Sequence, residues 1–262
     1  MMAVGQQELS ATARERALDA RGRMAWMGEL HSSAARDLIK ELQTLRGRKA
    51  TLQMRCDAAW RIARKYAPRA AALGALTLDI VRDLETHAAK QGCRGSSGLA
   101  ALVVTSREGS SQPLALKAVV ALTEVASGAY ADYGPQLELA YDLAQTPDDV
   151  AVRTWTVVDQ AAADGLPQPD LEVLAGLASI SVSSAYDWYA YEQSGGFAGD
   201  PGGAGDDDEP MLSTSDLRCG KWCRVGWADL GGALWGAIFS GGNVFVAVYR
   251  GTVVSLIAAA VI

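Results

Sequence analysis

Residues 227–262 read WADLGGALWGAIFSGGNVFVAVYRGTVVSLIAAAVI, and only Asp229 and Arg250 among them are charged. The 20 consecutive uncharged residues from Leu230 to Tyr249 would extend about 30 Å as a helix, which is the thickness of the hydrocarbon core of a membrane. Residues 240–243, SGGN, are a strong turn signal in the middle of this run. The sequence therefore predicts two apolar helices joined as a hairpin.

Small residues recur every four positions in both arms of the predicted hairpin. In a helix this spacing puts them on one face, where two backbones can approach closely. The predicted contact residues are Gly232, Gly236 and Ser240 in the first arm and Ala247, Gly251, Ser255 and Ala259 in the second. Such a hairpin can close on itself or on copies in other chains.

Three environments suit the hairpin. In a membrane, Trp227, Trp235 and Tyr249 would be interfacial anchors. In a soluble protein the same hairpin would be the buried centre of a helical bundle, because an apolar helix can be covered by protein as well as by lipid. In a third interpretation, residues 244–249, VFVAVY, form an aggregation-prone strand.

The rest of the chain predicts an all-α protein. Apolar residues return every three or four positions from about residue 6 to residue 193, and prolines stand near the first turn of several expected helices. Residues 99–104, LAALVV, could be a strand or a helical turn. The expected helices cover about 23–45, 49–67, 69–90, 114–130, 135–144, 147–164 and 169–192, with a break at Pro68.

The predicted organisation has three parts. Residues 1–193 form a helical bundle domain, residues 194–226 form an acidic glycine-rich linker, and residues 227–262 form the hairpin. The net charge of −6 combines a basic and an acidic part: residues 1–100 hold 17 Lys+Arg and 10 Asp+Glu, and residues 101–262 hold 7 and 20. Because the positive charges are interspersed with negative ones on several helix faces, no nucleic acid partner is expected.

Polar residues give little sign of chemistry. The two histidines, His31 and His87, lie in no metal or nucleophile motif, so no enzyme, metal or cofactor is expected. His31 and the adjacent Ser32 form the candidate polar site, and a half-buried structural histidine is favoured over a catalytic base. Cys219 and Cys223 are expected to be unpaired structural residues, and the alternatives are lipid attachment beside the apolar segment or oxidation outside the cell.

The expected location is the cytoplasm. Four scattered cysteines do not make a disulfide framework, and the N-terminal residues contain no apolar run of signal-peptide length. Membrane association, if present, would come through residues 227–262.

Two motifs resemble a family. The segment GELHSSAARDLI at residues 28–39 resembles the glycine, two residues, histidine pattern of a poorly characterised group of bacterial helical proteins, and ADLGGALWGAIFSGG at residues 228–242 resembles their tail, itself similar to glycine-zipper peptides of bacteriocins. The segment SVSSAYDWY at residues 181–189 is similar to the one that precedes that tail. Ser32 replaces the usual asparagine. The resemblance implies an all-helical fold and a bacteriocin-like tail, and implies no activity.

These observations lead to one expected function and one alternative. The expected function is a membrane-active or membrane-associating bacterial protein, in which a helical body carries or restrains the hairpin. The alternative is a soluble helical interaction protein with the hairpin buried in the core of the bundle. The candidate partners are a lipid membrane and, through the hairpin, further copies of the chain.

Overall fold

The computed structural model describes residues 10–46, 50–72, 74–94, 97–108, 128–197 and 220–262. Throughout this part of the chain the regular structure is helical, and no strand occurs in it. The prediction of an all-α fold is confirmed.

The first half of the chain forms four helices. Ser10 caps the first of them, with its side chain accepting a hydrogen bond from the Ala13 amide at 3.1 Å. The predicted break at Pro68 is wrong, because the second helix continues past this exposed proline for one more turn. The LAALVV segment is helical. The helices are α1 (Ala11–Leu45), α2 (Leu52–Ala72), α3 (Leu78–Lys90) and α4 (Leu99–Glu108).

The second half begins with a short 3₁₀ helix and continues with five α-helices. Thr146 and Asp149 form a capping box at the start of α7, which agrees with the helix predicted from residue 147. The last two helices form the C-terminal hairpin, which begins before the predicted start at residue 227. The helix predicted from residue 114 and most of the predicted linker lie outside the described residues. The elements are η1 (Ala129–Tyr133), α6 (Gly134–Asp142), α7 (Pro147–Ala163), α8 (Gln168–Gln193), α9 (Lys221–Phe239) and α10 (Val244–Val261).

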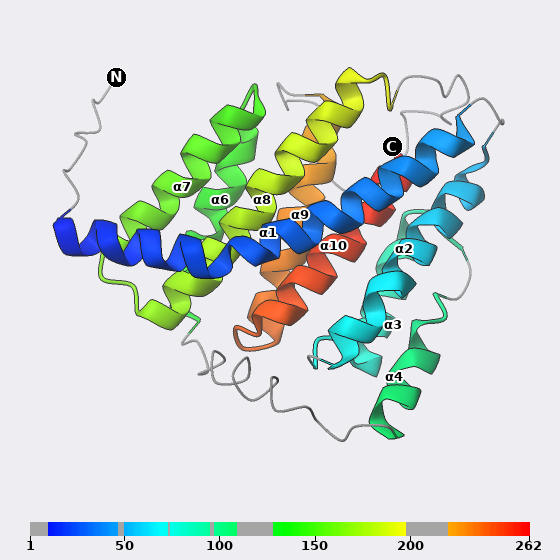
Figure 1. Ribbon diagram of the computed structural model, residues 1–262, viewed down its shortest axis with the longest axis horizontal. Coiled ribbons are helices and arrows are strands. Elements are labelled where there is room, and N and C mark those ends of the chain that lie inside the picture. Colours follow the sequence, from blue (N-terminus) through cyan, green and yellow to red (C-terminus); the bar gives the residue numbers. More distant parts are fainter. Residues whose placement is uncertain (1–9, 47–49, 73, 95–96, 109–127, 198–219) are drawn as a thin grey trace.

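The long helix α1 crosses the molecule and packs along α8, then reaches α10 and α2 (Figure 1). On one side of this crossing lie α6 and α7, and on the other lie α2, α3 and α4. The hairpin of α9 and α10 lies between these two groups, with α9 beside α8 and α6 and with α10 beside α2 and α3.

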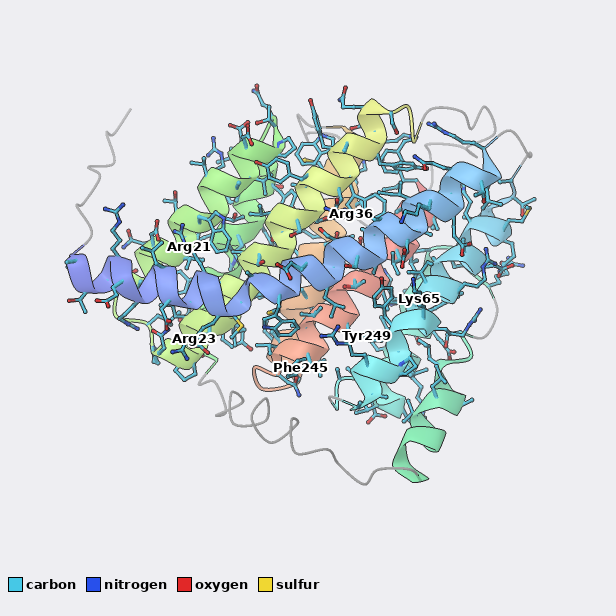
Figure 2. The ribbon with its side chains drawn as sticks, in the orientation of Figure 1. Arg21, Arg23, Arg36, Lys65, Phe245 and Tyr249 are labelled. Atoms are coloured by element: carbon cyan, nitrogen blue, oxygen red, sulfur yellow. A yellow bond between two sulfur atoms is a disulfide. The ribbon has the colours of Figure 1, made fainter. Side chains whose placement is uncertain are left out.

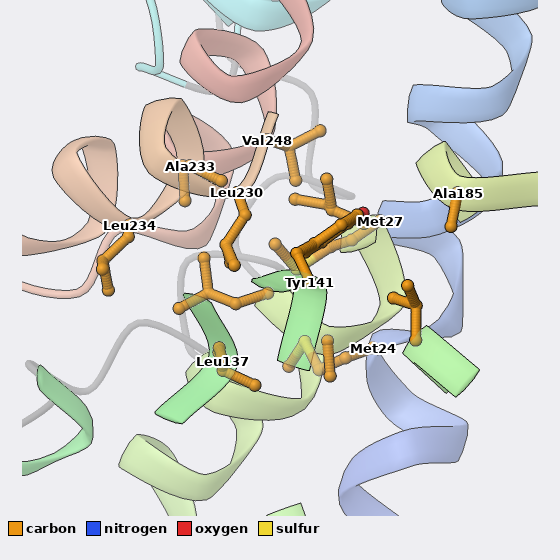
Figure 3. Packing of buried hydrophobic residues seen from close by; sticks show 14 of the residues in the cluster. Met24, Met27, Leu137, Tyr141, Ala185, Leu230, Ala233, Leu234 and Val248 are labelled. Atoms are coloured by element: carbon orange, nitrogen blue, oxygen red, sulfur yellow. The ribbon is translucent and has the colours of Figure 1, made fainter. Parts of the chain in front are cut away.

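Helix α10 belongs to both hydrophobic clusters of the fold. Ala247 and Val248 pack in a cluster formed mainly by α1, α6, α7, α8 and α9, where Met27, Tyr141 and Leu230 meet (Figure 3). Val253 and Ile257 pack in the second cluster, with α2, α3 and α4. A helix that is apolar on every side must be covered on every side. In this protein the other helices cover most of α10. The helical body is therefore arranged around the C-terminal hairpin.

Candidate functional site: the C-terminal hairpin

The turn between α9 and α10 has the conformation that its glycines allow. Gly241 and Gly242 have positive φ angles of 66° and 91°. Asn243 caps α10, and its side-chain oxygen accepts from the amides of Phe245 at 3.0 Å and Val246 at 3.3 Å. Ser240, one of the predicted contact residues, lies in this turn and donates its hydroxyl to the Gly236 carbonyl at 2.6 Å.

Four of the predicted contact residues lie where α9 and α10 approach each other. A Cβ added to Gly232 would be 3.1 Å from the Gly251 Cα, and one added to Gly236 would be 2.9 Å from the Ala247 Cα. A Cβ added to Gly251 would be 2.8 Å from the Ala233 Cβ. The small faces of the two arms therefore cover each other within one chain.

The other two predicted contact residues are Ser255 and Ala259. Both are buried in α10, and Ala259 belongs to the cluster formed with α1, α8 and α9. The Ser255 hydroxyl has no hydrogen-bond partner within the described residues.

Gly251→Ala is expected to destabilise the protein by about 1–3 kcal/mol, because the new methyl group meets the Asp229 carbonyl oxygen at 3.0 Å as well as Ala233. This cost exceeds the 0.5–1 kcal/mol that alanine gains over glycine in a helix. Gly231→Ala is the matched control, because its added Cβ would meet only Trp227, at 3.8 Å. Urea unfolding of both variants is the measurement. A stabilised Gly251→Ala would contradict the close contact of the two arms.

A buried polar cluster fastens α9 to the bundle. The Asp229 carboxylate accepts from the His31 Nε2 at 2.7 Å, from the Ser184 hydroxyl and from the Trp188 Nε1 at 3.4 Å. None of these four residues is exposed to solvent. The cluster thus joins α1, α8 and α9 around one carboxylate.

Gly28 explains how His31 reaches this position. A Cβ at Gly28 would lie 2.6 Å from the Ser179 hydroxyl and 2.7 Å from the Ser179 carbonyl oxygen. Only glycine therefore lets α1 pack this closely on α8, and one turn later His31 meets Asp229. Ser32, the other residue of the predicted polar site, is buried, and the described residues offer its side chain no hydrogen-bond partner.

The electrostatics of the cluster favour a protonated histidine. Complete burial lowers the pKa of His31, but the charge of Asp229 and its hydrogen bond, with a further contribution from Asp187, outweigh burial and leave the pKa raised above its ordinary value. The second ring nitrogen, Nδ1, is buried with no partner among the described side chains.

The cluster contains the residue types of a serine hydrolase triad in a different order. Asp229 lies between Ser184 and His31, so the imidazole accepts no proton from the serine hydroxyl in this arrangement. The cluster is also sealed from solvent. This geometry suits fastening of helices and not nucleophilic attack. Among the described residues, no group of His, Cys, Asp and Glu side chains is placed to hold a metal ion.

The opposite side of α9 is apolar. Its residues, which we call the outer face of α9, are Trp227, Ala228, Gly231, Trp235, Ile238 and Phe239. They recur at helical spacing and none is charged, and the exposed Lys221 and Arg224 continue this face toward the start of the helix. Trp227 and Ala228 are partly buried against the two hydrophobic clusters, and the residues nearer the turn are exposed. Trp235 is 52 % exposed and Phe239 is 71 % exposed, and their rings stack with centroids 4.6 Å apart. Figure 2 shows Phe245 at the same end of the hairpin, beside the turn.

The cysteines depart from the sequence-based expectation. Cys56 of α2 forms a disulfide with Cys93, which follows α3, and both residues are buried. Cys223 is also disulfide-bonded, so its expected unpaired state is wrong. The spacing of the four cysteines in the sequence does not predict which of them form disulfides. The fold places the Cα atoms of Cys56 and Cys93 5.4 Å apart, a distance that a disulfide can span.

Sequence reasoning also missed Asp229 as a site residue. Its signal was present, since a single acidic residue within a long apolar helix needs a buried partner.

Helix α10 alone is long and apolar enough to cross a membrane among the described helices, with a mean hydropathy of 2.0, and 78 % of it is buried inside the protein.

No family model, curated protein or solved structure matches this chain.

Proposed function

We propose that this protein associates reversibly with a lipid surface through the outer face of α9, while its helical body restrains the C-terminal hairpin. The observation that supports the proposal is the exposure of Trp235, Ile238 and Phe239 side by side at the hairpin turn. These three side chains lie at the turn end of the face, away from the exposed Arg224 at its other end, and aromatic and aliphatic side chains of this kind suit the boundary between headgroups and acyl chains.

Contact with the surface is favoured over insertion of the hairpin. Insertion in a bacteriocin-like manner would bring Asp229 and Arg250 toward the bilayer centre, at a cost of about 5–7 kcal/mol for the two charges on the insertion scale. It would also remove α10 from both hydrophobic clusters of the body. An outer face that is already exposed touches lipid without either cost.

The size of the outer face predicts weak binding. Full burial of a large apolar side chain is worth about 1.5–3 kcal/mol, but Trp235 and Ile238 are already about half buried and Phe239 is partly buried. Together they would contribute roughly 2–5 kcal/mol, which is below the binding energy of one myristoyl chain. The proposed association is therefore a reversible one.

A vesicle flotation experiment tests the proposal. The full chain is expected to float with phosphatidylcholine vesicles, and the variant Trp235→Ser, Ile238→Ser, Phe239→Ser is expected to lose at least tenfold in partitioning. The matched control is Leu139→Ser, Leu143→Ser, because these two side chains, one in α6 and one directly after it, are each 50 % exposed and lie off the outer face. Since the net charge is −6, anionic lipid is expected to add no affinity.

Two results would contradict the lipid proposal. Either the wild-type protein stays with the soluble fraction, or the control loses as much partitioning as the outer-face variant. Thermal melts of both variants confirm that each is folded.

A second candidate function is a soluble interaction protein, which is favoured by the deep packing of the hairpin in the body. In that case the outer face of α9 would contact another protein or a second copy of the chain. A wild-type protein that ignores vesicles, but whose oligomer dissociates in the outer-face variant, would support this function instead.

We infer from the disulfides that the protein works in an oxidising compartment. The described cysteines are all disulfide-bonded, and such bonds do not persist in a reducing cytoplasm. The inference replaces the cytoplasmic location expected from the sequence.

A further inference from the structure

The contact between His31 and Asp229 lies where three helices meet. His31 comes from α1, Asp229 from α9, and Ser184 and Trp188 from α8. Each donor reaches the same carboxylate, and water reaches none of the four side chains. The His31–Asp229 pair is therefore a contact through which α9 is joined to α1 without access of water.

We propose that His31 and Asp229 form a pH-sensitive latch that holds α9 against α1 and α8. The latch is fastened when the imidazole is protonated and is loosened when the imidazole is neutral. The proposal goes beyond lipid contact and does not depend on it.

Charge balance gives the physical reason. With a protonated His31 the buried pair has no net charge, and attraction over 2.7 Å adds to the hydrogen bond. With a neutral His31 the Asp229 carboxylate is a buried charge held only by neutral donors, and an unpaired buried charge is costly. The buried Nδ1 of His31 opposes the preference for the protonated imidazole, because protonation leaves one buried N–H without an acceptor among the described side chains.

Two charged side chains and one tyrosine lie around the His31–Asp229 pair. Asp187 of α8 favours its protonated form, and Arg36 of α1 lies on the solvent side, 3.0 Å from Asp187. From α6, Tyr141 donates to the Ser181 carbonyl, and burial raises its pKa well above the ordinary value, so it stays neutral.

The remaining neighbouring charge comes from α10. Arg250 points away from the latch, donates to the Gly232 carbonyl at 2.9 Å and pairs with Asp83 of α3 at 2.8 Å. It therefore does not compete for Asp229.

The sign of the pH dependence follows from the raised pKa of His31. The latch contributes its full stability below the unfolded value of 6.5, and this contribution is lost as the pH rises through the folded value. The ratio of folded to unfolded protein is expected to fall about tenfold for each unit that separates these two values.

The second histidine provides a matched control of opposite sign. Burial and the charges of Arg250 and Lys90 outweigh Asp83 and lower the pKa of His87. Its contribution to stability is therefore fully present above the unfolded value of 6.5 and is lost as the pH falls through the lowered folded value. No other histidine is present in the chain, so the two substitutions separate the two effects.

The test is urea unfolding of the full chain from about pH 5.5 to about pH 9 for wild type, His31→Gln and His87→Gln. Glutamine keeps an amide donor for Asp229 but does not titrate. Wild type and His87→Gln are expected to lose stability above pH 6.5, and His31→Gln is expected to show no such loss. Equal pH profiles for wild type and His31→Gln above pH 6.5 would overturn the latch.

Two measurements on the wild-type protein keep the proposal testable if His31→Gln does not fold. NMR titration of the imidazole should give a folded pKa for His31 above 6.5, and a value at or below 6.5 overturns the proposal. Hydrogen exchange, corrected for the intrinsic rate, should show α9 amides losing protection with rising pH relative to α2 amides. Unchanged relative protection also overturns it.

Discussion

Replacing Asp229 with alanine is expected to lower the free energy of unfolding by about 3–5 kcal/mol. The substitution removes the only acceptor of the hydrogen bonds from His31 and Trp188 that the described residues show, and leaves buried donors without partners. Since whole domains are stable by only about 5–15 kcal/mol, a loss of this size is a large fraction of the total. Urea or thermal unfolding, followed by circular dichroism, is the measurement.

Asp159→Ala is the matched control for Asp229→Ala. Asp159 also pairs with a basic residue, Arg21, but its side chain is 31 % exposed, and such pairs contribute only about 0–1 kcal/mol. The double variant His31→Leu, Asp229→Leu removes both charges and is expected to recover part of the loss, because apolar residues of similar volume often replace a buried ion pair. Equal losses in Asp229→Ala and Asp159→Ala would mean that the buried cluster does not stabilise the fold.

The His31–Asp229 contact marks what local sequence patterns cannot reveal. Periodicity placed His31 on the inward face of a helix, and the two residues are 198 positions apart in the chain. Their meeting depends on the close approach of α1 to α8 at Gly28, which is a tertiary property. The sequence predicts that each helix has a buried face, but it does not state which helix covers it.

The start of α7 was predicted from its local sequence, whereas the cap at Thr77 was missed, and the helix predicted over residues 69–90 is wrong because α3 begins only at Leu78. Thr146 and Asp149 define the start of α7 through reciprocal side-chain hydrogen bonds between residues three positions apart, and Pro147 stands at the first helical position. Pro68 shows the opposite case, because a proline near the end of a helix can start a helix or be tolerated within one. Packing of Ala67 and Ala70 in the second cluster keeps α2 helical across this point.

The hairpin shows why composition alone left two environments open. An all-apolar helix such as α10 satisfies the same length and hydropathy criteria in lipid and in protein. The two environments differ in what surrounds the helix. Here α1, α2, α3 and α8 pack on α10, and these helices lie more than 50 positions away in the sequence. The described body leaves Trp235, Ile238 and Phe239 of the outer face of α9 exposed.

Removing the Cys56–Cys93 disulfide is expected to cost about 3–4 kcal/mol. The two cysteines are 37 residues apart, and cross-linking a loop of this length restricts the unfolded chain by that amount in the loop-closure treatment. Both side chains are buried, so Cys56→Ala, Cys93→Ala avoids placing a hydroxyl in the second cluster. The measurement is the free energy of unfolding of this double variant in urea without reductant.

Reduction of the wild-type protein provides the control for this prediction. A reductant also opens the disulfide of Cys223, so it should lower wild-type stability at least to that of the double variant. The disulfide joins α2 to the segment after α3, and these elements cover one side of α10. Its loss should therefore increase hydrogen exchange in α2 and α3 before it does so in α7. A double variant as stable as wild type would show that the bridge is dispensable, and the inference of an oxidising compartment would lose its energetic basis.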